Sequence, residues 1–212
     1  MAISPWDWRP DDFGMEFIFG DANPKTYQGF NMTYNEASGN WTVTVPFPSG
    51  TFRYAFYPDC NGPYLTDLNC TPIVDPSNPP IQRLPGDQLY SNVQVPFNGR
   101  FQKNDYDWQL PLPNVADRGN ISFHLYPLVD YDNYMSPISL YLPAEYGTIP
   151  NKTYPVLYLQ HGGGGTDSDW FSEARAHDIF DRLINQGVIE PTIIVCPNFY
   201  DMPFKYAGLD QG

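Results

Sequence analysis

Positive charge is scarce in this sequence. Its 212 residues include 11 Lys and Arg against 24 Asp and Glu, which gives a formal net charge of −13. Proteins that bind nucleic acid neutralise phosphates with Lys and Arg, and an anionic membrane surface repels an acidic protein. We therefore expect neither nucleic acid nor a membrane as a partner.

Long apolar runs and a secretion signal are also missing. No stretch approaches the roughly 18 apolar residues of a membrane-spanning helix, and residues 1–10 lack the basic start and apolar centre of a signal peptide. Five Asn-x-Ser/Thr sequons nevertheless indicate passage through a secretory pathway. They begin at Asn31, Asn40, Asn69, Asn120 and Asn151. We expect a secreted, glycosylated protein of fungal type whose signal peptide is not in this sequence.

Cysteine occurs only three times. Cys60 and Cys70 flank a loop rich in Asn, Gly, Pro and Asp, and their spacing suits a small loop closed by a disulfide. Two free thiols are the alternative, which an oxidising compartment disfavours. Cys196 lies in an apolar run and is expected to be a reduced, buried, small hydrophobic side chain.

Helix signals are absent from the first half of the chain. Proline accounts for 23 of 212 residues and aromatic residues for 17%, a composition that suits short strands and ordered loops. Apolar runs separated by turns predict strands at 16–19, 27–34, 41–47, 51–57 and 92–97. Pro48-Ser49-Gly50 predicts a hairpin turn between two of them. Strands without helices between them favour a small antiparallel β-sandwich.

Residues 98–119 are polar, contain proline and show no periodicity, which is typical of a linker. The next two apolar segments, 120–128 and 136–143, predict a β-hairpin. In the second segment Ile138, Leu140 and Leu142 share one face and Tyr141 lies on the other. His124 lies in an alternating strand pattern and is interpreted as structural.

A strand, a glycine loop, a helix and a second strand follow. The short apolar run 154–160 predicts a buried strand, and the loop after it consists of His161, Gly162, Gly163, Gly164 and Gly165. Four glycines in a row carry an entropic cost, so the backbone there must turn sharply or approach something closely.

The helix after this loop is predicted to be amphipathic. Thr166, Asp167, Ser168 or Asp169 can cap its N-terminus, and Gly187 occupies the position of a C-terminal cap glycine. Its apolar face consists of Ile179, Phe180, Leu183 and Ile184. A second buried strand at 193–196 completes a unit that implies a parallel crossover.

This segment resembles the esterase D / feruloyl esterase family of α/β-hydrolases. The resemblance rests on Tyr-Pro-Val-Leu-Tyr-Leu-x-His-Gly-Gly-Gly-Gly, Asp-Trp, a helix and Pro-x-Ile-Ile-Val-x-Pro-Asn, spread over about fifty residues. It implies that 161–165 form an oxyanion loop, with the N–H of Gly163 or Gly164 as first donor and Trp170 supporting the loop. A glycine-rich turn in another βαβ unit is the alternative. The motifs of phosphate-binding loops are absent.

The first half of the chain resembles the immunoglobulin-like domain that precedes some of these esterases, a domain related to glycogen-binding modules. Residues 41–60 and 75–80 carry this resemblance. It implies an Ig-like β-sandwich over 1–98, a linker over 99–119 and the N-terminal, truncated part of an α/β-hydrolase domain over 120–212. Aromatic side chains can stack on sugar rings or fill a core. The candidates are Trp6, Trp8, Trp41, Tyr54, Tyr57 and Tyr64.

The catalytic residues of such an esterase are missing. The family needs a serine in Gly-x-Ser-x-Gly, a histidine base and an acidic residue. None of the ten serines has glycines two positions before and after it. His177, beside Asp178 and Asp181, has no nucleophile to serve, so a solvated helix face is expected there. In the family's order nucleophile, acid and base follow Pro197-Asn198, so the resemblance implies that none of the three is in this chain.

Two functions from different classes stay open. The first is a secreted serine ester hydrolase of feruloyl or acetyl esterase type, which acts on plant cell-wall or related esters through an acyl-enzyme. It implies an ester substrate, free or polysaccharide-linked, no metal and no organic cofactor, and an inactive chain when these 212 residues stand alone. The second is a non-catalytic carbohydrate-binding or relic protein. No motif in the sequence specifies the acyl group or the sugar of the substrate, or the oligomeric state of the protein.

Overall fold

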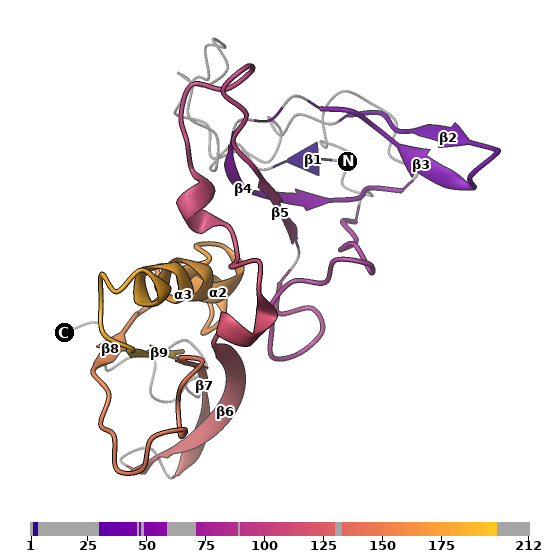
Figure 1. The fold of residues 1–212 in the computed structure, drawn as a ribbon. Coiled ribbons are helices and arrows are strands. Elements are labelled where there is room, and N and C mark those ends of the chain that lie inside the picture. The colour runs from indigo at the N-terminus through magenta and orange to yellow at the C-terminus, as the bar shows by residue number, and fades with distance from the viewer. Residues whose placement is uncertain are drawn as a thin grey trace. The chain divides into compact units, whose positions relative to one another are not determined.

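The structure, a computed structural model, divides the chain into two compact units, Met1–Leu110 and Pro111–Gly212. The described residues are 2–3, 30–45, 47, 49–58, 71–88, 90–129 and 133–198. Each unit has its own sheets (Figure 1). Several predicted features lie outside the described residues, namely the strand at 16–19, Cys60, Asn69, Cys70, Trp6, Trp8 and Tyr64.

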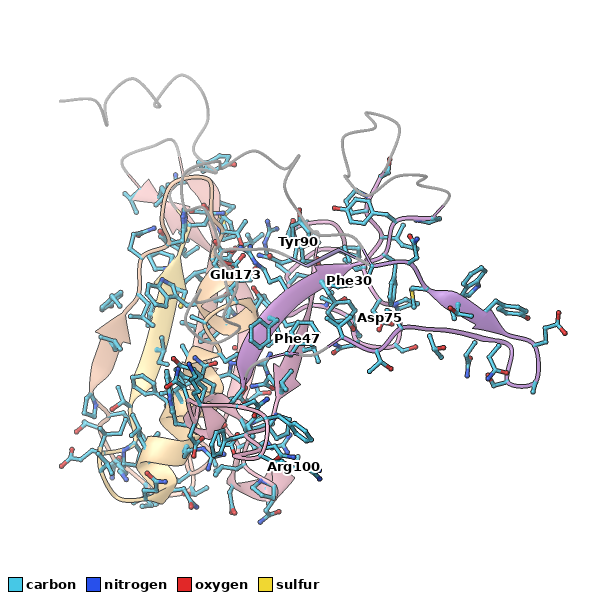
Figure 2. The ribbon with its side chains drawn as sticks, turned by 90° about the horizontal axis from the view of Figure 1, so that it is seen from above. Phe30, Phe47, Asp75, Tyr90, Arg100 and Glu173 are labelled. Atoms are coloured by element: carbon cyan, nitrogen blue, oxygen red, sulfur yellow. The ribbon has the colours of Figure 1, made fainter. Side chains whose placement is uncertain are left out.

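The main sheet of the first unit is antiparallel and has the order β1-β4-β5. Its strands are β1 (Ala2–Ile3), β4 (Gly50–Ala55) and β5 (Ser91–Val95). Phe52 and Tyr54 are buried on β4. Partly buried apolar side chains pack against this pair, and Figure 2 labels two of them, Phe30 and Phe47. The predicted strands at 51–57 and 92–97 are therefore confirmed, with bounds shifted by one or two residues.

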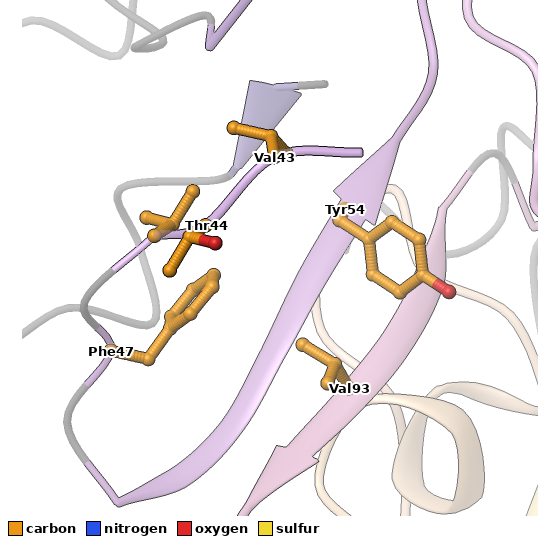
Figure 3. Close-up of a pocket in the computed structure, with 6 residues that line it drawn as sticks. Val43, Thr44, Phe47, Tyr54 and Val93 are labelled. Carbon is orange, nitrogen blue, oxygen red and sulfur yellow. The ribbon is translucent and has the colours of Figure 1, made fainter. Parts of the chain in front are cut away.

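An apolar hollow of about 350 Å³ lies beside this sheet (Figure 3). Its lining consists of Val43, Thr44, Val45, Phe47, Tyr54 and Val93. Several of these side chains also pack on the buried pair of β4. The hollow is thus an extension of the core, and its lining includes no charged side chain.

A short hairpin forms the second sheet of the first unit. It consists of β2 (Thr33–Asn35) and β3 (Asn40–Thr42), both shorter than predicted. The Asn35 side-chain oxygen accepts the N–H groups of Ala37 and Ser38 at 3.0 and 3.2 Å, and Gly39 has φ +70°. This turn chemistry explains why the strands end where they do.

The predicted hairpin across 48–50 is wrong. In the described residues β4 pairs with β1 and β5, whereas 40–42 pair with β2. A local turn signal cannot specify which distant strand completes a ladder, so the partner was misassigned. The described residues of the first unit form two antiparallel sheets. Their packing into an Ig-like sandwich stays a prediction.

The first part of the predicted linker is hydrogen-bonded into the first unit. The Asp107 carboxylate accepts the N–H of Phe97 at 2.6 Å, and the Tyr106 N–H donates to the Ser49 hydroxyl at 3.0 Å. Two 3₁₀ turns, η3 (Asp107–Gln109) and η4 (Val115–Asp117), lie on either side of the boundary between the units. Polar side chains in this part of the predicted linker, such as Asp107, therefore bind backbone groups of the first unit.

The second unit contains a mixed four-stranded sheet with the order β6-β7-β9-β8. Its strands are β6 (Asn120–Leu128), β7 (Tyr134–Leu142), β8 (Val156–Tyr158) and β9 (Ile193–Pro197). β6 and β7 form the predicted antiparallel hairpin, and β8 runs parallel to β9. The four strands are confirmed, but the predicted burial of 154–160 is wrong: only Val156–Tyr158 form a strand, and their side chains are exposed because β8 lies at the edge of the described sheet.

The predicted single helix is two helices, α2 (Asp169–Ser172) and α3 (Ala176–Asn185). The break falls at Arg175, whose φ of +54° is left-handed. The predicted end is confirmed, because Gly187 has φ +69° and the Val188 N–H donates to the Leu183 carbonyl at 2.9 Å. This pattern is the Schellman motif.

A buried carboxylate holds α3 on the sheet. Asp181 Oδ1 accepts the Tyr141 hydroxyl at 2.6 Å and the Gly119 N–H at 2.7 Å. A Cβ on Gly119 would lie 2.2 Å from the Tyr141 ring, so only glycine fits this approach. Burial raises the pKa of the Asp181 carboxyl and that of the Tyr141 hydroxyl. Tyr141 is fully buried, so its face of β7 is the covered one. Ile138, Leu140 and Leu142, on the other face, are only partly buried.

The expectation of a solvated helix face around His177 is wrong. Asp178 and Asp181 are 2% and 3% exposed, and the apolar positions of α3, such as Phe180, are only partly buried. The Asp178 carboxylate accepts the Arg175 Nε–H at 2.8 Å. A hydrogen-bonded carboxylate can be buried without prohibitive cost, and the helical pattern alone gave no sign of these partners.

Four of the five sequon asparagines lie in described residues and all four are exposed: Asn31, Asn40, Asn120 and Asn151. Their surface positions agree with the exposure that N-glycans require. In the described part of the chain no helix has the length and hydrophobicity of a membrane span.

His177 makes the second unit sensitive to acid. Its side chain is 12% exposed, and burial, reinforced by Arg175 and Arg118, lowers its pKa from 6.5 to about 3. Asp178 lies 3.5 Å from the ring but is bound to Arg175 at 2.7 Å. Between these pKa values the unfolded chain takes up a proton that the folded unit excludes, so stability falls as pH falls. From pH 6.5 to about 4.5 we expect a loss of the order of 2 kcal/mol.

Urea unfolding, followed by far-UV circular dichroism at about pH 7 and about pH 4.5, checks this. His177→Gln should reduce the pH dependence. His124→Gln should retain it, because the His124 ring is exposed and lies 2.9 Å from the neighbouring Ser122 hydroxyl. The same slope in all three proteins would contradict the assignment to His177.

Candidate active site

The glycine loop begins where β8 leaves the sheet. The last ladder bond runs from the Leu159 N–H to the Val195 carbonyl at 2.9 Å. The Trp170 indole N–H donates to the Gln160 carbonyl at 2.9 Å, so this side chain contacts the start of the loop. The supporting role predicted for Trp170 agrees with this contact and stays a prediction.

The loop presents two unused backbone donors. The Gly165 N–H donates to the Gly162 carbonyl at 3.1 Å and closes a turn, in which Gly164 has φ +76°. The N–H groups of Gly163 and Gly164 have no hydrogen-bond partner among the described residues, and both glycines are exposed. Paired N–H groups free to bind an anion are what an oxyanion hole requires.

The glycines serve different purposes. A Cβ on Gly165 would lie 2.3 Å from Asp169 Oδ2 and 3.1 Å from His161, so packing requires glycine there. Gly164 needs its left-handed conformation. Gly162 has open space around its Cβ position, so neither packing nor conformation explains it. Space beside a bare backbone is what a ligand needs to approach closely.

The His161 ring lies inside the site rather than on its surface. It is 5% exposed, with Nδ1 2.9 Å from the Gly162 carbonyl oxygen and Nε2 3.1 Å from Asn198 Oδ1. Asn198 follows β9 directly and is itself 8% exposed. His161 therefore fixes the loop to the end of β9 and is not placed as an exposed base.

A second buried link joins the far end of the loop to β7. The Ser139 hydroxyl donates to Asp167 Oδ2 at 2.6 Å, and both side chains are buried. Ser168 is the N-cap residue of α2, while the Thr166 hydroxyl donates to Asp169 Oδ1 at 2.7 Å. Asp167 was predicted only as a possible helix cap. The contacts of Ser139 and Asn198 were not predicted, because no local sequence pattern indicates their distant partners.

No serine near the loop is available as a nucleophile. The four serines that flank or support it are at most 1% exposed: Ser136, Ser139, Ser168 and Ser172. Cys196 is a free, buried thiol as predicted, and burial raises its pKa to about 12, which keeps it unreactive. In the residues that the structure describes, no group of three His, Cys, Asp or Glu side chains could hold a metal ion.

Residues 133–212, which include the loop, match the sequence model of the family described as "Putative esterase". This segment, 80 of the chain's 212 residues, is similar to esterases and is named the esterase segment. The esterase segment contains β7, β8, β9, both helices and the complete glycine loop.

Two curated proteins are similar to part of the chain. An endo-1,4-beta-xylanase/feruloyl esterase from Xylanibacter ruminicola is 37% identical over 80 residues, which cover 36% of this chain and 11% of that protein. Endo-1,4-beta-xylanase Y from Acetivibrio thermocellus is 43% identical over 63 residues, which cover 29% and 6%. The chain thus spans about a tenth or less of the length of these relatives.

Solved structures of feruloyl esterases are also similar. A mutant of the feruloyl esterase module from Clostridium thermocellum, complexed with sinapinate, has 33% sequence identity and a TM-score of 0.39. The similarity covers 45% of this chain and 31% of that one.

The glycine sterics of the esterase segment give a stability prediction. Gly165→Ala should destabilise the second unit by about 1–3 kcal/mol, because the Asp169 carboxylate is held by Thr166 and cannot move aside freely. Gly162→Ala, one turn away, should change stability by less than about 0.5 kcal/mol. Urea unfolding of the two variants and the parent chain measures both effects. Equal destabilisation by the two substitutions would show that the loop is not packed as described.

Proposed function

We propose that this chain supplies the oxyanion loop of a secreted serine ester hydrolase of the feruloyl or acetyl esterase type, built on an α/β-hydrolase fold. The N–H of Gly163 or Gly164 would be the first donor to the oxyanion of the tetrahedral intermediate, and the N–H of the residue after the nucleophile would be the second. The nucleophilic serine, the histidine base and the acidic residue would come from sequence beyond Gly212. An N-terminal Ig-like sandwich and N-glycosylation belong to the same proposal.

The exposed, unpaired N–H groups of Gly163 and Gly164 carry this proposal. They lie in a loop whose neighbouring side chains are buried and hydrogen-bonded, so their direction is set before any ligand arrives. One such donor contributes on the order of 3–4 kcal/mol to an acyl-transfer transition state. The similarity to an endo-1,4-beta-xylanase/feruloyl esterase supports plant cell-wall esters as the substrate class.

Hydrolysis of p-nitrophenyl acetate and methyl ferulate tests the proposal. The 212 residues alone should show no turnover, since nucleophile and base act as a unit and the serines that flank or support the loop in the described residues are buried. A longer product of the same reading frame should hydrolyse the esters and lose activity with a serine-directed phosphonate. In that product Gly162→Ala should lower turnover although it spares stability.

Two results would overturn it. Phosphonate-sensitive turnover by the 212-residue chain would refute the absence of the nucleophile. A stop codon directly after Gly212 in the transcript, with no turnover, would refute the hydrolase and favour a non-catalytic protein.

Carbohydrate binding by the first unit is the second candidate function. Tyr34 and Trp41 pair across β2 and β3, with ring centroids 5.2 Å apart, and are 48% and 62% exposed. Because side chains alternate along a strand, the sequon residue Asn40 faces the opposite side of the ribbon. A glycan there would leave the aromatic face open. Exposed rings without neighbouring basic groups suit a neutral sugar better than an anionic ligand.

Affinity electrophoresis of the whole chain in gels that contain neutral polysaccharide, such as xylan or glycogen, tests this function. Trp41→Ala should abolish most of the retardation. Trp108→Ala, which removes another exposed tryptophan of the same unit, should leave it unchanged. Unretarded migration of the parent chain in all gels would exclude sugar binding.

A further inference from the structure

One buried side-chain contact lies at the start of the glycine loop and another lies just beyond its end. At its start His161 meets Asn198 at 3.1 Å, and beyond its end Asp167 meets Ser139 at 2.6 Å. All four side chains are at most 8% exposed. Ser139 belongs to β7 and Asn198 directly follows β9, so each contact joins the loop to the sheet through a residue outside the loop.

Asn198 is itself fixed by β7. Its carbonyl accepts the Ser136 hydroxyl at 2.9 Å, and its N–H donates to the Pro137 carbonyl at 3.2 Å. A path of hydrogen bonds therefore runs from β7 through Asn198 to His161 and on to Gly162. Every residue on this path is more than nine-tenths buried except the glycine at its end.

The direction of these hydrogen bonds follows from the chemistry of each group. The Gly162 carbonyl can only accept, so His161 Nδ1 must carry the proton that lies between them, at 2.9 Å. In a neutral imidazole Nε2 is then an acceptor. The Asn198 side chain can serve either state of Nε2: its Oδ1, 3.1 Å away, accepts from a protonated Nε2, and its NH₂ group donates to an unprotonated one after a half-turn of the amide.

We propose that Asn198 and Ser139 are positioning residues for the oxyanion loop. Through His161 and Asp167 they hold the backbone of 162–165, and so aim the N–H groups of Gly163 and Gly164. The inference rests on the proposed ester hydrolysis for its catalytic meaning. A glycine-rich backbone is conformationally free, and displacement of an oxyanion donor by about 1 Å weakens transition-state binding severely. Fixed side-chain partners offset that freedom.

Hydrogen–deuterium exchange of the 212-residue chain, followed by mass spectrometry, tests the positioning without any need for activity. Asn198→Ala and Ser139→Ala should each speed exchange in 161–168 by about fivefold or more while α3 exchanges as in the parent. Asn120→Ala and Ser122→Ala, matched substitutions on β6, should leave the loop unchanged. Unchanged loop exchange in both test variants, or equally faster exchange in α3, would overturn the proposal.

The histidine ring offers a second measurement on the parent chain, which matters if a variant fails to fold. Nitrogen-15 spectra should show a proton on Nδ1 of His161, because this atom lies 2.9 Å from the Gly162 carbonyl oxygen. The chain has only three histidines, so His124→Gln and His177→Gln assign the signals by elimination. A ring without a proton on Nδ1 would overturn the path from Asn198 through His161 to Gly162.

A longer, active product separates this inference from the proposed function. There Asn198→Ala should lower kcat by about tenfold or more and change KM by less than about twofold, because the donors act on the transition state. A higher KM with unchanged kcat would count against positioning. If no product hydrolyses esters, the proposed function fails, while exchange and ring protonation still decide whether Asn198 and Ser139 hold the loop.

Discussion

The second unit depends on the carboxylate of Asp181. It receives the Tyr141 hydroxyl and the Gly119 N–H within 2.7 Å while almost fully buried, and so joins α3, the central strand β7 and the chain before β6. Loss of either partner leaves a buried acceptor short of a hydrogen bond, at a cost of about 1–3 kcal/mol. This packing also bears on the loop between β8 and α2, because both of these elements belong to the second unit.

Rigid and free groups are divided sharply within the loop. Its flanking side chains, His161 and Asp167, are buried and hydrogen-bonded, whereas the N–H groups of Gly163 and Gly164 are exposed and have no hydrogen-bond partner in the part of the chain that the structure describes. A site that must stabilise transient negative charge benefits from this division, since its donors need no reorganisation when charge appears. The similarity of 133–212 to the sequence model of esterases gives that arrangement a chemical context.

The sequence predicted those features that depend on neighbouring residues. The apolar runs of β8 and β9, the cap at Gly187 and the His-Gly loop each have a local cause, and the structure contains all of them. The unpredicted features depend on distant partners. Asp181 is buried because Tyr141 lies forty residues earlier in the sequence, and Asn198 meets His161 across a separation of 37 residues. Polar residues of this kind look solvent-facing until their partner is known, which also explains the linker segment around Asp107.

The end of the sheet has a practical consequence. β8 is the last strand in the described order, its side chains are 36–70% exposed, and no Asp, Glu, Lys or Arg occurs between Lys152 and Asp167. Natural edge strands discourage pairing with foreign strands through charge, especially lysine. β8 has no charged side chain, so concentrated samples of the 212-residue chain will tend to self-associate along this edge. One lysine in place of Tyr158, the most exposed side chain of the strand, is the least invasive remedy for anyone preparing it.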